Sequence, residues 1–438
     1  MNLRIRITSV AFLAASATVA GAQQRPPVRQ LGAVVAKSTE TFVNAASVRA
    51  LSNGSVLVND VGGRRVLLFN PALSSFTVIA DSTSATANAY AGRTGSLIAY
   101  RGDSSLFIDP TSVSMLVIDA AGKVARVMAI PRAEDALMIG GTLGNSAFDA
   151  SGRLVYRAGA RFQMVGRGAG GPGGFTMPDP PDSALILRVD LTTRHLDTLG
   201  FIRTPKIKLD VKRDDRGNIS VQSMINPLPV VDDWAVTSDG AVAFVRGRDY
   251  HVDWVNSDGS KTSSAKIPFD WQRMTDEDKI AFIDSLKAAR ERLGANAPVP
   301  TGGGAPPGAG GGTPQVMIFA GPGGPGGGPG AGGGLRTGPN GALQPPSFVP
   351  ANELPDYKPP FFAGSTRADT DGNLWIRTIP TSAIAGGPVY DVVNRTGEIV
   401  ERVQIPVGRS IVGFGPGGAV YLLNRDGTTT TLEKATVR

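Results

Sequence analysis

Six segments of this chain share one pattern: an alternating apolar run, a tight turn that contains glycine, and a second alternating run. Asn53-Gly54 and Asp239-Gly240 are examples of the turn. Such dipeptides between alternating runs are the strongest short-range signal for a β-hairpin, because the turn requires positive φ. The turn glycines of the six segments are Gly54, Gly102, Gly152, Gly240, Gly372 and Gly418. The pattern therefore predicts an all-β chain.

A second hairpin follows most of these segments, so each repeat predicts a four-stranded antiparallel unit. Where no insertion intervenes, successive turn glycines are 48, 50 and 46 residues apart, close to the period of about 40 to 50 residues of β-propeller blades. The repeats resemble those of secreted six-bladed β-propellers of the NHL-repeat and TolB-like group, over residues 30–438. This resemblance implies a fold and says little about chemistry. A pair of β-sandwiches and a seven-bladed ring are the alternatives.

The two ends of the chain predict how the ring closes. Residues 31–36 alternate like a strand but have no hairpin partner of their own, and residues 428–434 form the last alternating run. We expect the N-terminal strand to complete the last blade. Such closure leaves no free sheet edge between the first and last blades.

The N-terminus has the features of a secretory signal peptide. Residues 1–22 contain Arg4 and Arg6, an apolar stretch over 7–20, and the small residues Ala20-Gly21-Ala22 at the end. The apolar stretch is too short for a membrane span, which needs about 20 residues. We therefore expect an exported protein, periplasmic or secreted, without a membrane span.

Composition excludes several kinds of site. The chain has no cysteine and two histidines, which excludes disulfides, Cys-ligated zinc, iron–sulfur clusters, thiol nucleophiles and a three-histidine metal site. Charged residues are 18% of the chain and the formal charge is +7, so we expect no nucleic-acid partner. Serine-nucleophile and phosphate-loop lysine motifs are absent as well.

Two insertions interrupt the repeat. The first is a Gly/Pro-rich loop over 166–182, whose formal G-x-G-x-x-G lacks the strand and helix that a dinucleotide site requires. The second contains a capping box at Thr275 and Asp278 and apolar residues every three or four positions, which predicts an amphipathic helix over 276–293, within 275–294, that lies against the propeller. It continues into 301–346, where 28 of 46 residues are Gly or Pro, a composition typical of disorder.

Both insertions fall between the second and third strands of a blade or between blades. These connections share one face, whereas the Gly turns lie on the other. Long loops concentrate on that face, and long loops often carry function.

Polar residues recur where the innermost strands begin on the loop-rich face. About seven residues before the turn glycines stand Ser47, Gly95 or Ser96, Asn145, Asp233, Ser365 and Ser410, with Asn44, Arg93, Asp232 and Arg409 as neighbours. An oxygen-rich ring of this kind suits a hard cation such as Ca²⁺, with Asn145 and Asp233 as ligands. Calcium-dependent lactonase-like propellers bring a Glu, an Asn and an Asp together there, and this chain has no glutamate at the matching positions. Polar ends of inner strands are also common as simple solvation of a wet channel, and this is the alternative explanation of the ring.

A second constellation lies in the fourth repeat, between its second and third strands. Arg246 and Arg248 offer planar forks for a carboxylate or phosphate, Tyr250 offers a stacking face, and His251 titrates near neutrality. Asp232 and Asp233 are expected beside them. An ordinary hairpin loop, in which Asp249 pairs with one arginine, is the alternative; His195 has no assigned role.

These observations favour a binding or interaction module that uses its loop-rich face to hold a protein, a small molecule or a carbohydrate, with no catalytic residue and no required cofactor. The alternative is a calcium-assisted hydrolase or lactonase at the central ring. A structural stalk domain is a third possibility.

Overall fold

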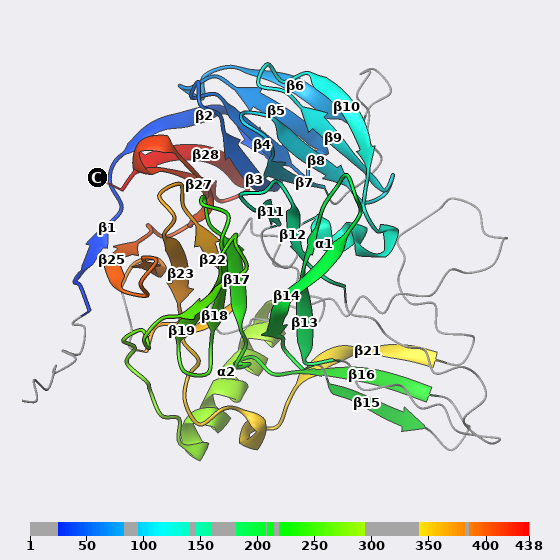
Figure 1. The fold of residues 1–438 in the computed structure, drawn as a ribbon. Helices are drawn as coiled ribbons and strands as arrows, with labels where there is room; N and C mark the ends of the chain where they lie inside the picture. The colour runs from blue at the N-terminus through cyan, green and yellow to red at the C-terminus, as the bar shows by residue number, and fades with distance from the viewer. Residues whose placement is uncertain are drawn as a thin grey trace, which may run out of the picture.

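In the computed structural model, residues 25–82, 95–140, 146–159, 181–206, 208–213, 219–293, 341–381 and 385–437 are described. The fold is all-β, built from many antiparallel sheets (Figure 1). The expected signal peptide, the Gly/Pro-rich loop up to residue 180, and residues 301–340 of the expected disordered segment lie outside the described residues. No helix in the described ranges is long and apolar enough to span a membrane.

Six sheets each contain four antiparallel strands, which are consecutive in the chain in every sheet but the sixth. The first sheet is β3(Ala45–Ala50), β4(Val56–Asp60), β5(Arg65–Phe69) and β6(Phe76–Asp81); the second is β7(Ser96–Ala99), β8(Ser105–Asp109), β9(Ser114–Ile118) and β10(Val124–Ala129). The third is β11(Ala147–Phe148), β12(Leu154–Arg157), β13(Ser183–Val189) and β14(Leu196–Arg203); the fourth is β17(Asp233–Val236), β18(Val242–Arg246), β19(His251–Val255) and β20(Lys261–Ser263). The fifth is β22(Phe361–Ala368), β23(Leu374–Thr378), β24(Val389–Val393) and β25(Ile399–Gln404), which β1(Val28–Gln30) extends in parallel. The sixth is β26(Arg409–Gly415), β27(Ala419–Asp426), β28(Thr429–Thr436) and β2(Val34–Phe42).

The predicted turn glycines each join the first two strands of a sheet. All six have positive φ, between 57° at Gly102 and 83° at Gly372. An L-residue with a Cβ rarely adopts this conformation, so glycine is required there. The hairpin predictions from the sequence are confirmed at all six positions.

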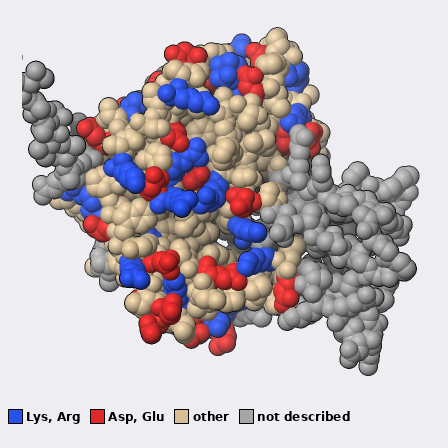
Figure 2. Space-filling view, turned by 60° about the horizontal axis from the view of Figure 1, so that its bottom comes forward, with Lys and Arg blue, Asp and Glu red and all other residues tan. Residues whose placement is uncertain are grey.

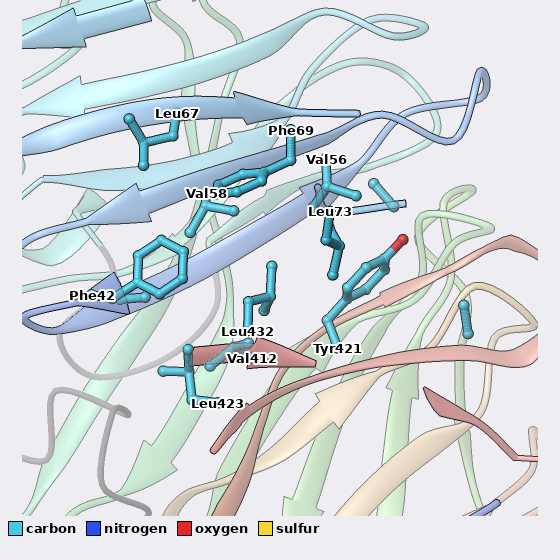
Figure 3. Packing of buried hydrophobic residues seen from close by; sticks show 13 residues of the cluster. Phe42, Val56, Val58, Leu67, Phe69, Leu73, Val412, Tyr421, Leu423 and Leu432 are labelled. Atoms are coloured by element: carbon cyan, nitrogen blue, oxygen red, sulfur yellow. The ribbon is translucent and has the colours of Figure 1, made fainter. Parts of the chain in front are cut away.

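Each sheet packs against the next through a buried apolar cluster. Clusters join the first sheet to the second, the second to the third, and so on to the fifth and sixth. One further cluster joins the sixth sheet to the first, with Tyr421 and Leu432 facing Phe69 and Val58 (Figure 3). Cyclic packing of this kind is consistent with a β-propeller and differs from a pair of β-sandwiches.

The N-terminal strand pairs with the C-terminal strand, as the sequence predicts. β2 is antiparallel to β28, with Lys37 opposite Glu433 and Phe42 opposite Thr430. The Ser38 hydroxyl accepts a hydrogen bond of 2.9 Å from the Leu432 amide, and Phe42 is buried in the cluster between the sixth and first sheets. Residues from both ends of the chain therefore build one sheet.

A seventh, three-stranded sheet was not expected from the sequence. It contains β15(Lys208–Arg213), β16(Ile219–Ile225) and β21(Gly341–Phe348), and β21 runs parallel to β16. Residues 341–346 were expected to be disordered, and this expectation was wrong. The edge of β16 supplies backbone hydrogen-bond partners, so a Gly/Pro-rich segment gains order that its composition alone cannot provide.

The predicted helix α2(Asp276–Leu293) has the expected bounds and cap. The Thr275 hydroxyl accepts a hydrogen bond of 3.2 Å from the Asp278 amide, and the Asp278 carboxylate accepts one of 2.9 Å from the Thr275 amide. The sequence predicted that this helix would lie against the propeller. In the structure its main contacts are instead with the segment around residues 349–354. Its buried Ile283 packs with Val349 and Leu354, which flank the short helix η2(Ala351–Glu353). The remaining short helices of the described residues are η1(Ala133–Asp135), α1(Ala136–Ile139) and η3(Pro416–Gly418).

The capping box gives a first prediction. Thr275→Ala removes the side-chain acceptor of the Asp278 amide, and we expect the first turn of α2 to lose about 1 kcal/mol of local stability. Hydrogen exchange of the amides at 276–280 measures this loss. Glu291→Ala, in the exposed last turn, is the matched control. Equal exchange rates in both variants would show that the cap does not stabilise the helix.

Candidate functional site

The inner strands of the six sheets begin on the face that carries the long connections. The connection β12–β13 holds the Gly/Pro-rich loop, β14–β17 holds β15 and β16, and β20–β22 holds α2 and β21. First strands of neighbouring sheets contact one another, as β26 does with β3 and β17 with β22. The starts of these strands are therefore close to the centre of the ring, beside the inserted elements. Figure 2 shows several Lys and Arg side chains near the middle of the face that it presents.

Most of the expected ring residues lie at the starts of inner strands. Ser96 and Asp233 are the first residues of β7 and β17, and Ser47, Ser365 and Ser410 lie in β3, β22 and β26. Asn145 and Arg93 lie outside the described residues. Arg409 is bound to Glu433 at 2.6 Å, and the Asn44 amide donates to Asp60 at 3.0 Å. The Arg409 side chain therefore has a structural partner, whereas the bond at Asn44 involves its backbone amide and not its side chain.

Several polar atoms near these strand starts are buried without a partner in the described part of the chain. They are the hydroxyls of Ser96 and Ser146, the amide oxygen of Asn59 and the Nε of Arg157. Ser146 immediately precedes β11, and the pairing of Ala147 with Val155 places it at the same end of the third sheet as Arg157. Buried polar groups are almost always hydrogen-bonded, so each of these atoms requires an explanation such as a water or a ligand.

Asp233 is the central ionisable group of this region. Its side chain is buried, and its carboxylate accepts a hydrogen bond of 2.7 Å from the Thr366 amide of the neighbouring sheet. Burial raises the pKa of Asp233 to about 6, although backbone amides, that of Thr366 first, oppose the rise. The group is therefore a carboxylate that changes its charge in the range where many acid–base catalysts work.

Sequence reasoning missed two arginines that interact electrostatically with Asp233. Arg157 ends β12 of the third sheet, and Arg367 lies in β22 of the fifth; the charge of Asp233 acts on both. Burial lowers the pKa of each guanidinium. The signal available in the sequence was a single arginine inside an otherwise apolar strand, as in Leu-Val-Tyr-Arg157.

The described residues near Asp233 do not by themselves form a calcium site. Among the described residues, no three His, Cys, Asp or Glu side chains come together as metal ligands. Asp233 is the carboxylate of the region, and Arg157 and Arg367 would repel a cation there. Calcium binding through Asn145 and Asp233 stays a prediction, since Asn145 is outside the described residues.

The second constellation is held together mainly by its own acidic residues. Arg246 donates to Asp232 at 2.9 Å and to Asp253 at 2.8 Å, and its guanidinium also bonds the Phe201 carbonyl. His251 lies between Asp249 and Asp253, at 2.8 and 3.2 Å. A groove of about 370 Å³ beside Arg246 is open between the third and fourth sheets.

Tyr250 and Arg248 differ in exposure. Tyr250 is fully buried with a φ of 43°, and its hydroxyl donates to Asp391 at 3.4 Å; burial raises its pKa well above the usual value. It presents no ring face to solvent in this conformation. Arg248 is exposed. Ligand binding by this constellation stays a prediction; its residues are Arg246, Arg248, Tyr250, His251, Asp232 and Asp233. His195, which has no assigned role, is exposed, and its Nε2 lies 2.9 Å from a carboxylate oxygen of Asp197.

Comparison with known proteins identifies no family. No protein-family model matches the chain, and no curated protein matches it. Among solved structures it is similar to a calcium-binding regucalcin from Agrobacterium tumefaciens, with 11% identity over 94% of this chain and 98% of that chain and a TM-score of 0.39. A gluconolactonase from Xanthomonas campestris has 11% identity over 93% of this chain and 99% of that chain, with a TM-score of 0.37. A virginiamycin B lyase from Staphylococcus aureus has 10% identity over 92% of this chain and 98% of that chain, with a TM-score of 0.34. TM-scores this low carry no inference about activity.

Proposed function

We propose that the protein is an exported six-bladed β-propeller that binds a ligand at the centre of its loop-rich face. The cyclic packing of six four-stranded sheets supports the blade count. The predicted signal peptide supports export. Membership in the NHL-repeat and TolB-like group is part of this proposal and rests on the turn pattern alone.

One observation carries the binding function: the buried polar atoms without partners at the starts of the inner strands. Ser96, Ser146, Asn59 and Arg157 come from three different sheets. A folded protein leaves few such atoms unsatisfied, because each costs about 1 to 3 kcal/mol. A bound molecule would satisfy several of them together. The inserted elements α2, β15, β16 and β21 belong to connections on the same face, where they would border the ligand.

Retention of a ligand tests this proposal. Protein purified from its host under native conditions and without chelator is analysed by native mass spectrometry and then denatured to release small molecules. We expect a compound in stoichiometric amount, which Ser146→Val binds less tightly. Thr396→Val, on an exposed turn at the opposite face, is the matched control. Protein that retains nothing, and takes up nothing from a small-molecule extract of the host envelope, would contradict the proposal.

A hydrolase or lactonase is the second candidate, because the pKa of Asp233 is raised to about 6. A buried carboxylate with such a pKa can act as a general base near neutral pH. Calcium would need oxygen ligands beyond the described set. Lactone turnover that requires calcium and disappears in Asp233→Asn would establish this candidate in place of a pure binding protein.

A further inference from the structure

Three inner arginines form no ion pair within the described part of the chain, in contrast to several other arginines of the ring. Arg65, Arg153, Arg402 and Arg409 form ion pairs with buried acids of their own sheets, namely Asp60, Asp149, Asp391 and Glu433. Arg157, Arg367 and Arg377 have neither an ion pair nor a hydrogen bond from their guanidinium groups to any described residue, and the Nε of Arg157 is buried without a partner. Their side chains are half-buried.

The strand register brings two of these arginines to one face of the fifth sheet. Arg367 in β22 is opposite Trp375 in β23, and Arg377 is two residues further along β23, opposite Tyr390. Cross-strand partners and residues two apart on a strand point to the same side of a sheet. Both guanidinium charges accordingly act on Tyr390.

Arg157 reaches the same place from the third sheet. Its charge interacts with Asp233 at the start of β17, and the charge of Arg367 interacts with the same carboxylate. The third and fifth sheets are not neighbours, because the fourth lies between them. Both arginines therefore act on Asp233, the first residue of the inner strand β17, from the sheets on either side of the fourth.

The electrostatic balance of this cluster favours an anion. The charges of Arg157 and Arg367 both act on Asp233, Arg377 lies on the same face of the fifth sheet as Arg367, and arginine remains protonated at any physiological pH. Partly buried cations without counter-ions are unfavourable, because they lose hydration and gain little in return. Guanidinium groups present planar pairs of donors that match the oxygens of carboxylates and phosphates. The buried hydroxyl of Ser146, at the Arg157 end of the third sheet, is a further donor.

We propose that Arg157, Arg367 and Arg377 form a binding site for a small oxyanion, a carboxylate or a phosphate, at the centre of the ring. This inference rests on the proposed binding function and specifies the chemical class of its ligand. Asp233 then has a positioning role, because its carboxylate attracts the guanidinium groups of both Arg157 and Arg367. A neutral sugar or a bare cation would not neutralise the three arginines.

Calorimetric titration of the full mature chain with citrate and with inorganic phosphate tests the site. EDTA is present throughout, and sodium chloride keeps the ionic strength constant. We expect saturable binding of at least one anion, and the stronger of the two identifies a carboxylate or a phosphate ligand. Arg157→Met and Arg367→Met should each weaken it roughly tenfold or more, since a charged hydrogen bond contributes about 1.5 to 3 kcal/mol. Arg126→Met, on the exposed outer strand β10, should bind like the natural sequence.

A second measurement separates a binding role from a structural one. In anion-free buffer, Arg367→Met should raise the thermal midpoint, because methionine keeps the apolar stem and removes an unpaired charge. A lower midpoint together with unchanged anion affinity would overturn the inference. Binding of a neutral host compound, with no response to citrate or phosphate, would also overturn it and leave the proposed function intact. If the protein binds neither anion and no host compound, both this inference and the proposed binding function are wrong.

Discussion

A variant that begins at Ala45, and so lacks β2, will be far less stable than the natural chain or will fail to fold. It loses the pairing of β2 with β28 and the burial of Phe42 between the sixth and first sheets. Removal of a buried phenylalanine side chain alone costs about 3 to 5 kcal/mol. The truncation also exposes β28, whose Leu432 and Glu433 are buried, as a free sheet edge. We expect a loss above about 5 kcal/mol, a large share of the stability of an ordinary domain.

The matched control begins at Leu31 and lacks only β1. That strand is exposed at all three positions and adds to the outside of the fifth sheet, so its removal should change the thermal midpoint little. Both variants are compared with the natural chain by thermal unfolding. Should the chain that begins at Ala45 not accumulate, co-expression with a peptide of residues 31–44 should restore soluble protein by strand addition. Equal melting of the two truncated chains would show that β2 does not close the fold.

The hairpins, the closing strand and helix α2 were predictable because each depends on local chemistry. Gly54 and Gly240 mark turns through a φ requirement that acts within four residues. Thr275 and Asp278 mark the helix start in the same local way. The closing strand followed from counting strands at both ends. Signals of this range are present in the sequence before any packing is known.

The seventh sheet was not predictable, because its pairing is not local. β16 and β21 are separated by more than a hundred residues and run parallel. The composition of 301–346 pointed away from a strand, and the contact that orders 341–346 is supplied by β16. Tertiary pairing therefore outweighed local preference in this segment.

The candidate site was predictable only in part. Asp233 was found by counting back from Gly240, because strand starts repeat with the blades. Arg157, Arg367 and Arg377 were missed, since they lie at strand positions where most other sheets carry apolar or small residues. Their meeting point depends on two sheets that are not adjacent. The Arg246 to His251 loop gave the reverse case: a suggestive run of residues whose charges the fold largely pairs with Asp232, Asp249 and Asp253.

Asp233→Asn will change how stability depends on pH. The pKa of Asp233 is about 6 in the folded protein and about 3.9 in an unfolded chain. Because the folded pKa is the higher one, the folded state binds the proton more tightly. This contribution to stability is complete below about pH 4 and is lost as the pH rises through about 6. A difference of about two pKa units corresponds to about 3 kcal/mol, and the buried carboxylate is not screened by solvent.

Asparagine cannot ionise, and its amide oxygen can still accept the hydrogen bond from the Thr366 amide. The natural chain should therefore lose about 3 kcal/mol relative to the variant between pH 4 and pH 7. Urea unfolding of both chains across this range measures the difference. Asp371→Asn, at an exposed turn, is the control and should follow the natural chain. Parallel curves for Asp233→Asn and the natural chain would mean that attraction to Arg157 and Arg367 offsets the effect of burial on the pKa of Asp233, which would leave less positive charge to bind an anion.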